Sequence, residues 1–222
     1  TTYGIYNNAD IKAKNIKFEE EISTFELRTN KNETISINLN SPGEHNIYNA
    51  LASASVALEL DIPITYIKKG LENYLGVKRR FEIRYNKNEI IIVDDYAHHP
   101  SEVSATLTAA KNGWEKRILA VFQPHLYSRT KDFYIDFAKA LSQADIVIIT
   151  DIYPAREKPI KNVTSKLIAK ELTKINFTNL IETRLEKIPA TINEIKKTND
   201  LIIFMGAGNI NSKIEETIEL IK

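Results

Sequence analysis

The sequence predicts an α/β protein: a doubly wound, mostly parallel sheet in the C-terminal part, preceded by a smaller α+β region. Segments made almost entirely of apolar residues recur along the chain, which is typical of strands buried on both faces of a parallel sheet. These segments are residues 90–93, 118–122, 146–149 and 201–205. Stretches with helical spacing separate and follow them, at residues 100–112, 131–143, 164–174, 184–196 and 211–222. Strands that alternate with helices in this way predict a doubly wound fold.

The first 40 residues follow a different pattern. Apolar and polar side chains alternate there, which predicts antiparallel strands with one face in water. The alternation covers residues 16–18, 25–27 and 35–39. Apolar residues then recur at helical spacing from Gly43 to Leu60, and a second helix is expected from Pro63 to near Gly70. This region is therefore expected to be mixed, with antiparallel strands and two helices.

The composition excludes several classes of protein. The 222 residues include 30 Lys and Arg against 29 Asp and Glu, so the net charge is +1. A polyanion-binding surface over the whole chain is therefore not expected, and neither is a nucleic-acid partner. With no cysteine, a disulfide framework, a thiolate metal site and a cysteine nucleophile are all excluded.

The ends of the chain and its hydropathy bear on compartment and completeness. No apolar run approaches the length of about 20 residues that spans a bilayer, and no secretory signal opens the chain, so a cytoplasmic protein is expected. The chain begins at Thr1 and its only methionine is Met205. We therefore expect it to be a piece of a longer protein.

Ligands of open α/β sheets bind beyond the carboxyl ends of the strands. This rule directs attention to the loops after the four apolar segments, which are residues 94–100, 123–130, 151–158 and 206–209. Three of the four histidines lie in these loops, a clustering that a structural core does not require. The loops are therefore the candidate site.

The first of these loops is rich in groups that can do chemistry. Asp94 and Asp95 end an apolar strand, and His98 and His99 precede Pro100. One interpretation is capping of the helix that follows. The other is that an Asp binds a ribose diol while a histidine faces a substrate. Zinc ligation is a third interpretation, but adjacent residues on a loop seldom converge on one ion, so no metal site is predicted.

Two other features each have a functional and a structural interpretation. Arg129 could bind a carboxylate or phosphate through paired hydrogen bonds, or be a solvated surface residue, and Thr130 is a candidate N-cap of the next helix. The glycines at 206 and 208 form an incomplete dinucleotide fingerprint, because position 211 is Asn, and a tight turn explains them equally well.

Two further pairs of residues lie earlier in the chain. Asn46 and Asn49 are three apart on a helix, so they share a face that could read an adenine edge, although an N-cap and a surface residue explain them too. Arg79 and Arg80 lie where the mixed region gives way to the α/β region, where they suit phosphate recognition or form a solvated charge run with Lys78.

Several of these motifs occur together in a familiar order. They are Gly43-x-His45-Asn46-x-x-Asn49, Gly76-Val77-x-Arg79-Arg80-Phe81, Asp94-Asp95-Tyr96-Ala97-His98-His99-Pro100, Phe122-Gln123-Pro124-His125-x-Tyr127-Ser128-Arg129-Thr130 and Gly206-Ala207-Gly208-Asn209-Ile210. The series resembles the Mur ligases of peptidoglycan synthesis. The third and fourth motifs resemble those of the members that add L-alanine. The resemblance covers essentially the whole chain.

The resemblance implies a division of the chain and a set of roles. It implies that residues 1–78 are the C-terminal part of the central ATP domain, and that residues 79–222 are a Rossmann-like C-terminal domain that binds the amino acid. A phosphate-binding loop, Gly-x-x-x-x-Gly-Lys-Thr/Ser, does not occur in the chain. The implied ATP-binding residues are Asn46, Asn49, Arg80 and Asp95. The implied substrate-binding residues are Tyr96, His98, His99 and Arg129, with Arg80 and His98 supporting catalysis.

The implied reaction is ATP- and Mg²⁺-dependent amide formation between UDP-N-acetylmuramate and L-alanine through an acyl phosphate, in the bacterial cytoplasm. The chain alone is expected to be inactive, with most metal ligands outside it and a hinge at residues 77–81. Leu126 departs from the pattern, since these ligases usually have arginine there. Either one substrate contact is lost or another cation, such as Arg156, replaces it. The alternatives are a ligase that recycles murein peptides and a non-catalytic nucleotide-binding module.

Overall fold

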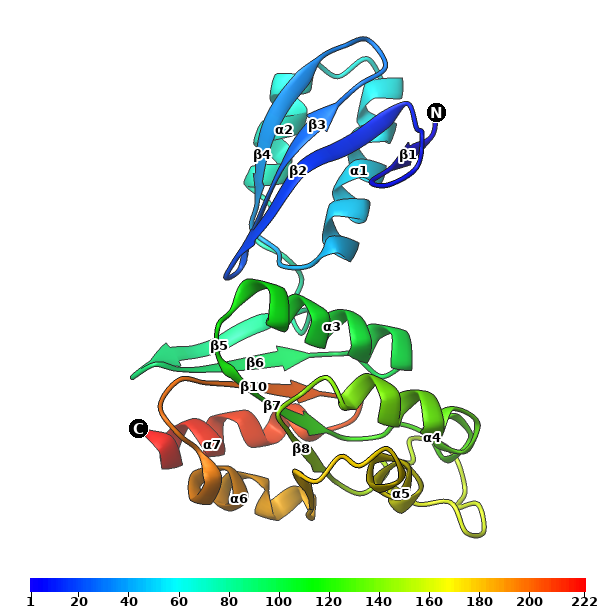
Figure 1. Cartoon of the computed structure of the whole chain (residues 1–222), viewed down its shortest axis with the longest axis vertical. Helices are drawn as coiled ribbons and strands as arrows, with labels where there is room; N and C mark the ends of the chain where they lie inside the picture. Colours follow the sequence, from blue (N-terminus) through cyan, green and yellow to red (C-terminus); the bar gives the residue numbers. More distant parts are fainter. The chain divides into compact units, whose positions relative to one another are not determined.

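The structure is a computed structural model that describes all 222 residues. Contacts divide the chain into two compact units. The first comprises Thr1–Val77 with Ala109–Glu115, and the second comprises Lys78–Thr108 with Lys116–Lys222. Figure 1 shows the elements of each unit along the chain. No helix is both long enough and apolar enough to cross a membrane.

The first unit is a four-stranded sheet with two helices. Its strands are β1 (Tyr3–Gly4), β2 (Ile11–Glu19), β3 (Ile22–Arg28) and β4 (Thr34–Leu39), in the order β1-β2-β3-β4. The pairs β2–β3 and β3–β4 are antiparallel, as the alternation predicts, and the short β1 runs parallel to β2. The helices α1 (Glu44–Glu59) and α2 (Ile64–Glu72) follow.

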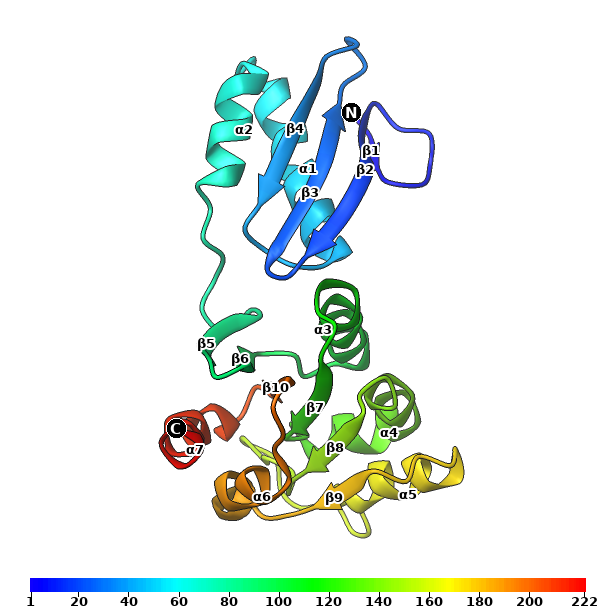
Figure 2. The same cartoon turned by 60° about the vertical axis from the view of Figure 1, so that its left-hand side comes forward.

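One face of this sheet is covered by the helices and forms the core of the unit (Figure 2). Phe25, Leu27 and Ile37 on the sheet pack with Ile47 and Leu51 on α1, and all five are at most 1% exposed. The observed helices therefore lie where the helical spacing places them. The polar side chains that alternate with the core residues along the strands are left on the opposite face.

The second unit is a six-stranded sheet with helices on both faces. Its strands are β5 (Glu82–Lys87), β6 (Ile90–Asp95), β7 (Arg117–Phe122), β8 (Ile146–Ile149), β9 (Leu180–Glu182) and β10 (Asp200–Met205), in the order β5-β6-β10-β7-β8-β9. All neighbouring pairs are parallel except β5–β6. The α-helices are α3 (Pro100–Gly113), α4 (Tyr127–Leu141), α5 (Lys166–Lys174), α6 (Ile188–Ile195) and α7 (Ile214–Ile221). The end of α3, from Ala109 onward, is grouped with the first unit. Short 3₁₀ turns η1 (Leu185–Lys187) and η2 (Ile210–Lys213) precede α6 and α7.

The helices are shared between the two faces of this sheet. Helices α3, α4 and α5 lie on one side of it and α6 and α7 on the other (Figure 2). The central strands are consequently buried throughout, and every residue of β6 and β10 is buried. This explains why the apolar runs are continuous. The four apolar segments are the strands β6, β7, β8 and β10, so the predicted fold class is confirmed.

Two strands of this sheet were not predicted. Strand β5 reads Glu-Ile-Arg-Tyr-Asn-Lys and lies at the sheet edge, where one side of the strand faces water and few apolar residues are needed. Strand β9 has only three residues at the opposite edge. Helix α4 begins at Tyr127 rather than near residue 131, so Ser128 and Arg129 are helical.

Candidate functional site

The carboxyl ends of four parallel strands meet at one edge of the second sheet. Strand β10 lies between β6 and β7, so the segment after Met205 lies beside the segments after Asp95 and Phe122. An isolated bridge between His125 and Tyr153 continues the pairing of β7 and β8 beyond the strands. Histidine, tyrosine and arginine side chains therefore gather at this edge, as the rule for open sheets predicts.

Three rings from three of these loops form the centre of the candidate site. The rings of His98 and His125 lie edge to face with centroids 6.0 Å apart, and the His125 ring stacks on Tyr153 at 5.8 Å with 13° between the planes. Tyr96 contacts His98 edge to face at 5.2 Å. We call these four residues the aromatic cluster. Sequence names Tyr96 and His98 as candidate site residues, whereas for His125 and Tyr153 it predicts only that they lie in the candidate loops.

Hydrogen bonds define the role of Nδ1 on each histidine. The Nδ1 atom of His98 lies 2.8 Å from the carbonyl oxygen of Tyr96, which can only accept, and 3.2 Å from the Glu102 carboxylate, so Nδ1 donates, and Nε2 is an acceptor whenever the ring is uncharged. The Nδ1 atom of His125 lies 3.3 Å from Nη1 of Arg129, which can only donate, so this Nδ1 accepts. Arg129 is therefore brought to the cluster, and its role toward a substrate stays a prediction.

The electrostatic surroundings keep His125 uncharged. Burial, the Arg129 guanidinium and His98 lower the pKa of His125, and Glu157 opposes them. A neutral imidazole beside a permanent cation offers both a hydrogen-bonding edge and a positive charge. This combination suits a small ligand that carries a carboxylate and a second polar group.

The start of α4 differs from the sequence-based expectation. Thr130 is not the N-cap: it lies within the first turn of α4, is buried, and its hydroxyl donates to the Leu126 carbonyl at 2.8 Å. The N-cap is Leu126, which has φ of +73°. The backbone N–H of Ser128 donates to the Glu157 carboxylate at 2.9 Å, so a side chain from the loop after β8 caps this helix.

The two aspartates at the end of β6 are buried rather than exposed to a ligand. Asp95 is 5% exposed, and its two oxygens accept the N–H groups of Ala97 at 2.7 Å and Phe81 at 2.9 Å. Burial raises the pKa of Asp95, and these hydrogen bonds oppose that rise. Both N–H groups lie outside α3, so the structure does not show Asp95 capping the helix that follows, and its role toward a ribose stays a prediction.

The two arginines before β5 have different surroundings. The Arg80 side chain is 55% exposed, and Nη1 lies 3.7 Å from Glu102 Oε1, so its guanidinium is accessible to an anion. The Arg79 side chain is 23% exposed and lies 3.3 Å from Asp94, which has no exposed surface. The predicted phosphate-binding residue, Arg80, is thus the more accessible of the two.

His99 is predicted with the substrate-binding residues, but the structure does not bring it into the aromatic cluster. Its ring lies edge to face on Phe133 of α4 at 5.1 Å, and its Nδ1 is 2.8 Å from the Ser101 hydroxyl. His99 lines a separate cavity of about 510 Å³ between α3 and α4. Neighbouring residues at a strand-to-helix junction point in different directions, which explains why His98 and His99 separate.

Close packing explains the glycines of the last loop. A Cβ atom on Gly208 would lie 2.3 Å from Oε1 of Gln123 and 2.6 Å from Cγ of Tyr153. The Gln123 side chain also bonds the two residues that follow Gly208: it donates to Asn209 at 3.0 Å and accepts the Ile210 N–H at 3.1 Å. The structural interpretation of these glycines, a tight turn, accounts for the close approach to Gln123 and Tyr153.

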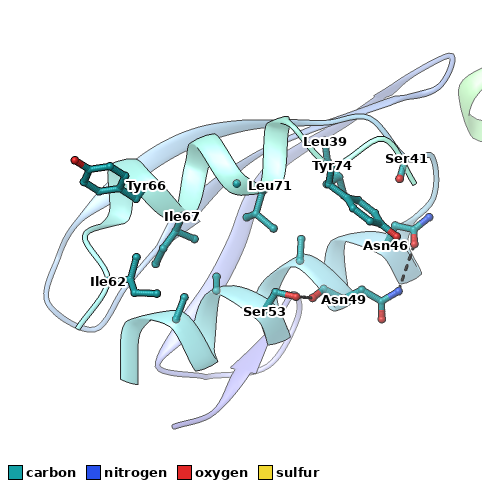
Figure 3. A pocket seen from close by; sticks show the side chains of 14 residues that line it. Leu39, Ser41, Asn46, Asn49, Ser53, Ile62, Tyr66, Ile67, Leu71 and Tyr74 are labelled. Atoms are coloured by element: carbon teal, nitrogen blue, oxygen red, sulfur yellow. Dashed lines mark hydrogen bonds between the residues drawn. The ribbon is translucent and has the colours of Figure 1, made fainter. Parts of the chain in front are cut away.

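The two asparagines lie in the first unit, at one end of a cavity of about 540 Å³ between α1 and α2 (Figure 3). The Nδ2 of Asn46 donates to the Pro42 carbonyl at 2.8 Å, and the Oδ1 of Asn46 accepts from Nδ2 of Asn49 at 3.3 Å. Because a carbonyl only accepts, this order fixes both amides, and Asn49 presents its oxygen outward. The ring of Tyr74 lies at the same end of the cavity (Figure 3).

No group of three histidine, aspartate or glutamate side chains is placed so that it could hold a metal ion. Each unit carries candidate ligand-binding groups of its own. The first unit offers an asparagine oxygen beside an apolar cavity, and the second offers the aromatic cluster with Arg129. An open, doubly wound sheet with such groups at its carboxyl edge defines an α/β ligand-binding domain.

Comparisons with known proteins identify the family. The Mur ligase glutamate ligase domain matches residues 79–208, and the Mur ligase middle domain matches residues 1–57. The chain belongs to the Mur ligase family.

Individual members of this family are similar to the chain. A UDP-N-acetylmuramate–L-alanine ligase of Geotalea daltonii is 40% identical over 100% of this chain and 49% of its own length. One of Clostridium novyi is 44% identical over 94% of this chain and 45% of its own. The crystal structure of the UDP-N-acetylmuramate–alanine ligase of Thermotoga maritima matches with a TM-score of 0.80 at 26% identity, over 98% of this chain and 46% of that one. The chain thus spans about half the length of the relatives it matches.

Proposed function

We propose that this chain is the C-terminal portion of a ligase that joins L-alanine to UDP-N-acetylmuramate in peptidoglycan synthesis. In this reaction ATP is consumed, the sugar carboxylate becomes an acyl phosphate, and the amine of alanine displaces phosphate. The observation that carries the proposal is the identity of 40% to an alanine-adding ligase over the full length of the chain. On this proposal, residues 1–78 belong to the central ATP domain and residues 79–222 form the amino-acid-binding domain.

The groups on the first unit fit the base of ATP. The outward oxygen of Asn49 can accept the exocyclic amine of adenine, and the cavity beside it is lined mainly by apolar side chains. Asn46 supports Asn49 by accepting its amide proton. ATP would supply the phosphoryl group that activates the carboxylate, and the exposed guanidinium of Arg80 would bind phosphate oxygens. The ribose contact of Asp95 is part of the same proposal. Mg²⁺ is also proposed for the reaction, with most of its ligands outside this chain.

The aromatic cluster fits the amino acid. Arg129 would bind the carboxylate of alanine, and its hydrogen bond to His125 holds the guanidinium in place. Because Nδ1 of His98 donates to the Tyr96 carbonyl, Nε2 of the uncharged ring would be an acceptor that can receive a proton from the amine as it attacks. Tyr96, beside His98, would limit the space available to the substrate. On this proposal, these residues contribute to catalysis mainly by positioning the amine of alanine for its attack on the acyl phosphate.

The test measures phosphate release by the complete protein with ATP, Mg²⁺, UDP-N-acetylmuramate and either L-alanine or a muramyl tripeptide. The proposal predicts release with alanine, and no release above background by the 222-residue chain alone. Release only with the tripeptide would show a peptide-recycling ligase, an alternative that Leu126 favours because it replaces an arginine in the amino-acid loop. Nucleotide binding without release in either case would show a non-catalytic module.

A further inference from the structure

Arg79 contacts three separate parts of the second unit. Its Nη2 donates to the Gly206 carbonyl at 2.7 Å, beyond β10. Its Nε lies 3.3 Å from the carboxylate of Asp94 at the end of β6. Its Cζ lies 4.9 Å from the centroid of the Tyr96 ring. One guanidinium therefore joins the ends of two neighbouring strands and stacks on a member of the aromatic cluster.

The backbone of Arg79 is fixed by the same surroundings. Its carbonyl oxygen accepts the N–H of Tyr96 at 2.7 Å, and its N–H donates to Glu82 at 2.8 Å. Its φ is +59°, in the left-handed region that side chains other than glycine seldom adopt. A non-glycine residue held there indicates that the surrounding contacts determine its conformation. Main chain and side chain of Arg79 thus both hold Tyr96.

The buried carboxylate beneath Arg79 explains why a cation is needed at this position. Asp94 has no exposed surface, and burial raises its pKa while Arg79 opposes the rise. A lysine could neutralise Asp94 as well. The ammonium group of a lysine could not, however, make the other two contacts of Arg79 at the same time. The planar guanidinium can donate to the Gly206 carbonyl with its edge while its face covers the Tyr96 ring.

We propose that Arg79 is a positioning residue of the amino-acid site and acts through the Tyr96 ring. It holds Tyr96 against His98, whose ring lies 5.2 Å away, and so fixes the side of the aromatic cluster that faces the substrate. Arg79 itself is not assigned a contact with the substrate. This inference rests on the proposed function, since it assigns Tyr96 to the alanine site.

The first measurement uses the 222-residue chain and does not depend on activity. The histidine ring resonances are recorded by NMR for the wild type, Arg79→Lys and the control Arg84→Lys. Arg84 pairs with Glu215 on the surface and contacts no member of the cluster. Arg79→Lys is expected to shift the His98 resonance through the displaced Tyr96 ring and to leave His99 unchanged. An unchanged His98 resonance in the folded variant would overturn the proposal.

The second measurement is a double-mutant cycle in the complete protein, with phosphate release as the readout. Arg79→Lys is expected to raise the KM for alanine about tenfold with kcat within about twofold. Once Tyr96→Ala is present, Arg79→Lys is expected to have little further effect, because it acts through the missing ring. If the effects of Arg79→Lys and Tyr96→Ala were fully additive, or if only the KM for ATP changed, the proposal would be contradicted. A wild type that releases no phosphate with alanine would count against the proposed function, whereas the His98 resonance would still decide whether Arg79 holds Tyr96.

Discussion

The backbone N–H of Leu126 donates to the carbonyl oxygen of Tyr153 at 3.0 Å, and this bond holds the loop after β7 against the loop after β8. Leu126 has φ of +73° and is the N-cap of α4, which carries Arg129. His125, immediately before it, stacks on Tyr153. The unusual backbone of one leucine therefore sets the relative positions of the imidazole and the guanidinium at the candidate site.

The left-handed conformation of Leu126 predicts an inverted order of stability for two substitutions. Leu126→Gly and Leu126→Ala both remove the side chain, but only alanine keeps the Cβ that disfavours positive φ. We expect the glycine variant to be the more stable by about 1 kcal/mol in urea unfolding. At Lys131, exposed on α4, the same pair of substitutions should show the opposite order, because glycine weakens a helix. If the alanine variant were the more stable at both positions, the left-handed conformation of Leu126 would be contradicted.

The contact of Gly208 with Gln123 and Tyr153 predicts that alanine will not fit there. A Cβ at 2.3 Å from Oε1 and 2.6 Å from the Tyr153 ring must displace both side chains. Gly208→Ala is expected to lower the free energy of unfolding by about 1–3 kcal/mol. Gly70 is the matched control: nothing lies within 4 Å of a Cβ there, and it is inside α2. Gly70→Ala should be neutral or stabilising, and a neutral Gly208→Ala would show that the loop has room.

The pairing of Arg129 with His125 predicts a change in the titration of His125. Its pKa is lowered by burial and by Arg129, so the folded chain binds this proton less readily than the unfolded chain. The stability contributed by neutral His125 is therefore present above a pH of about 6.5 and is lost as the pH falls toward the lower pKa of the folded state.

We expect Arg129→Gln to raise the pKa of His125 in an NMR titration. Arg156→Gln is the control, since Arg156 is exposed and does not contribute to the lowered value. The loss of stability on going from neutral pH to below about 6 should also be smaller in Arg129→Gln. A pKa of His125 that does not change would mean that burial and the other neighbouring groups set it without Arg129.

An ion pair at the amino end of the sheet should be important for stability. Asp200 has no exposed surface, and it accepts from Arg117 Nε at 2.7 Å, from Arg117 Nη2 at 2.8 Å and from the Lys197 N–H at 2.7 Å. Asp200→Ala removes the acceptor of Arg117 Nε and of the Lys197 N–H, although Arg117 Nη2 keeps the Ile195 carbonyl, and is expected to cost about 3 kcal/mol or more in urea unfolding. Glu219 pairs with Lys222 on the surface, and Glu219→Ala should cost less than about 1 kcal/mol. Similar losses of stability in the two variants would contradict the inference that burial makes the Asp200 ion pair the more important one.

The sequence predicted the parts of the fold that depend on burial. Continuous apolar runs exist because helices cover both faces of β6, β7, β8 and β10, so those strands could be found from the runs themselves. Edge strands were missed because an edge needs less apolar surface, as the polar sequence of β5 shows. The early start of α4 was missed because its N-cap is a leucine with positive φ, which no capping signal announces.

The candidate site was predicted to the level of its loops and only partly to the level of its residues. The carboxyl-edge rule and the family resemblance selected Tyr96, His98 and Arg129, which the structure brings together around His125. His99 could not be separated from His98 by sequence, because the direction of each side chain depends on where α3 begins. Arg79 was paired with Arg80 as one charged run, and only the contacts with Gly206 and Tyr96 distinguish them.

The central claim is that the aromatic cluster and Arg129 form the amino-acid site. Its most direct test compares substitutions of two arginines in the complete protein. The KM for L-alanine is measured by phosphate release for the wild type, Arg129→Lys and Arg156→Lys. If Arg129 binds the carboxylate through its planar guanidinium, Arg129→Lys raises this KM about tenfold, and Arg156→Lys changes it less than twofold, within about 0.4 kcal/mol. A larger effect at Arg156, or no effect at Arg129, would contradict the assignment of the aromatic cluster and Arg129 as the amino-acid site.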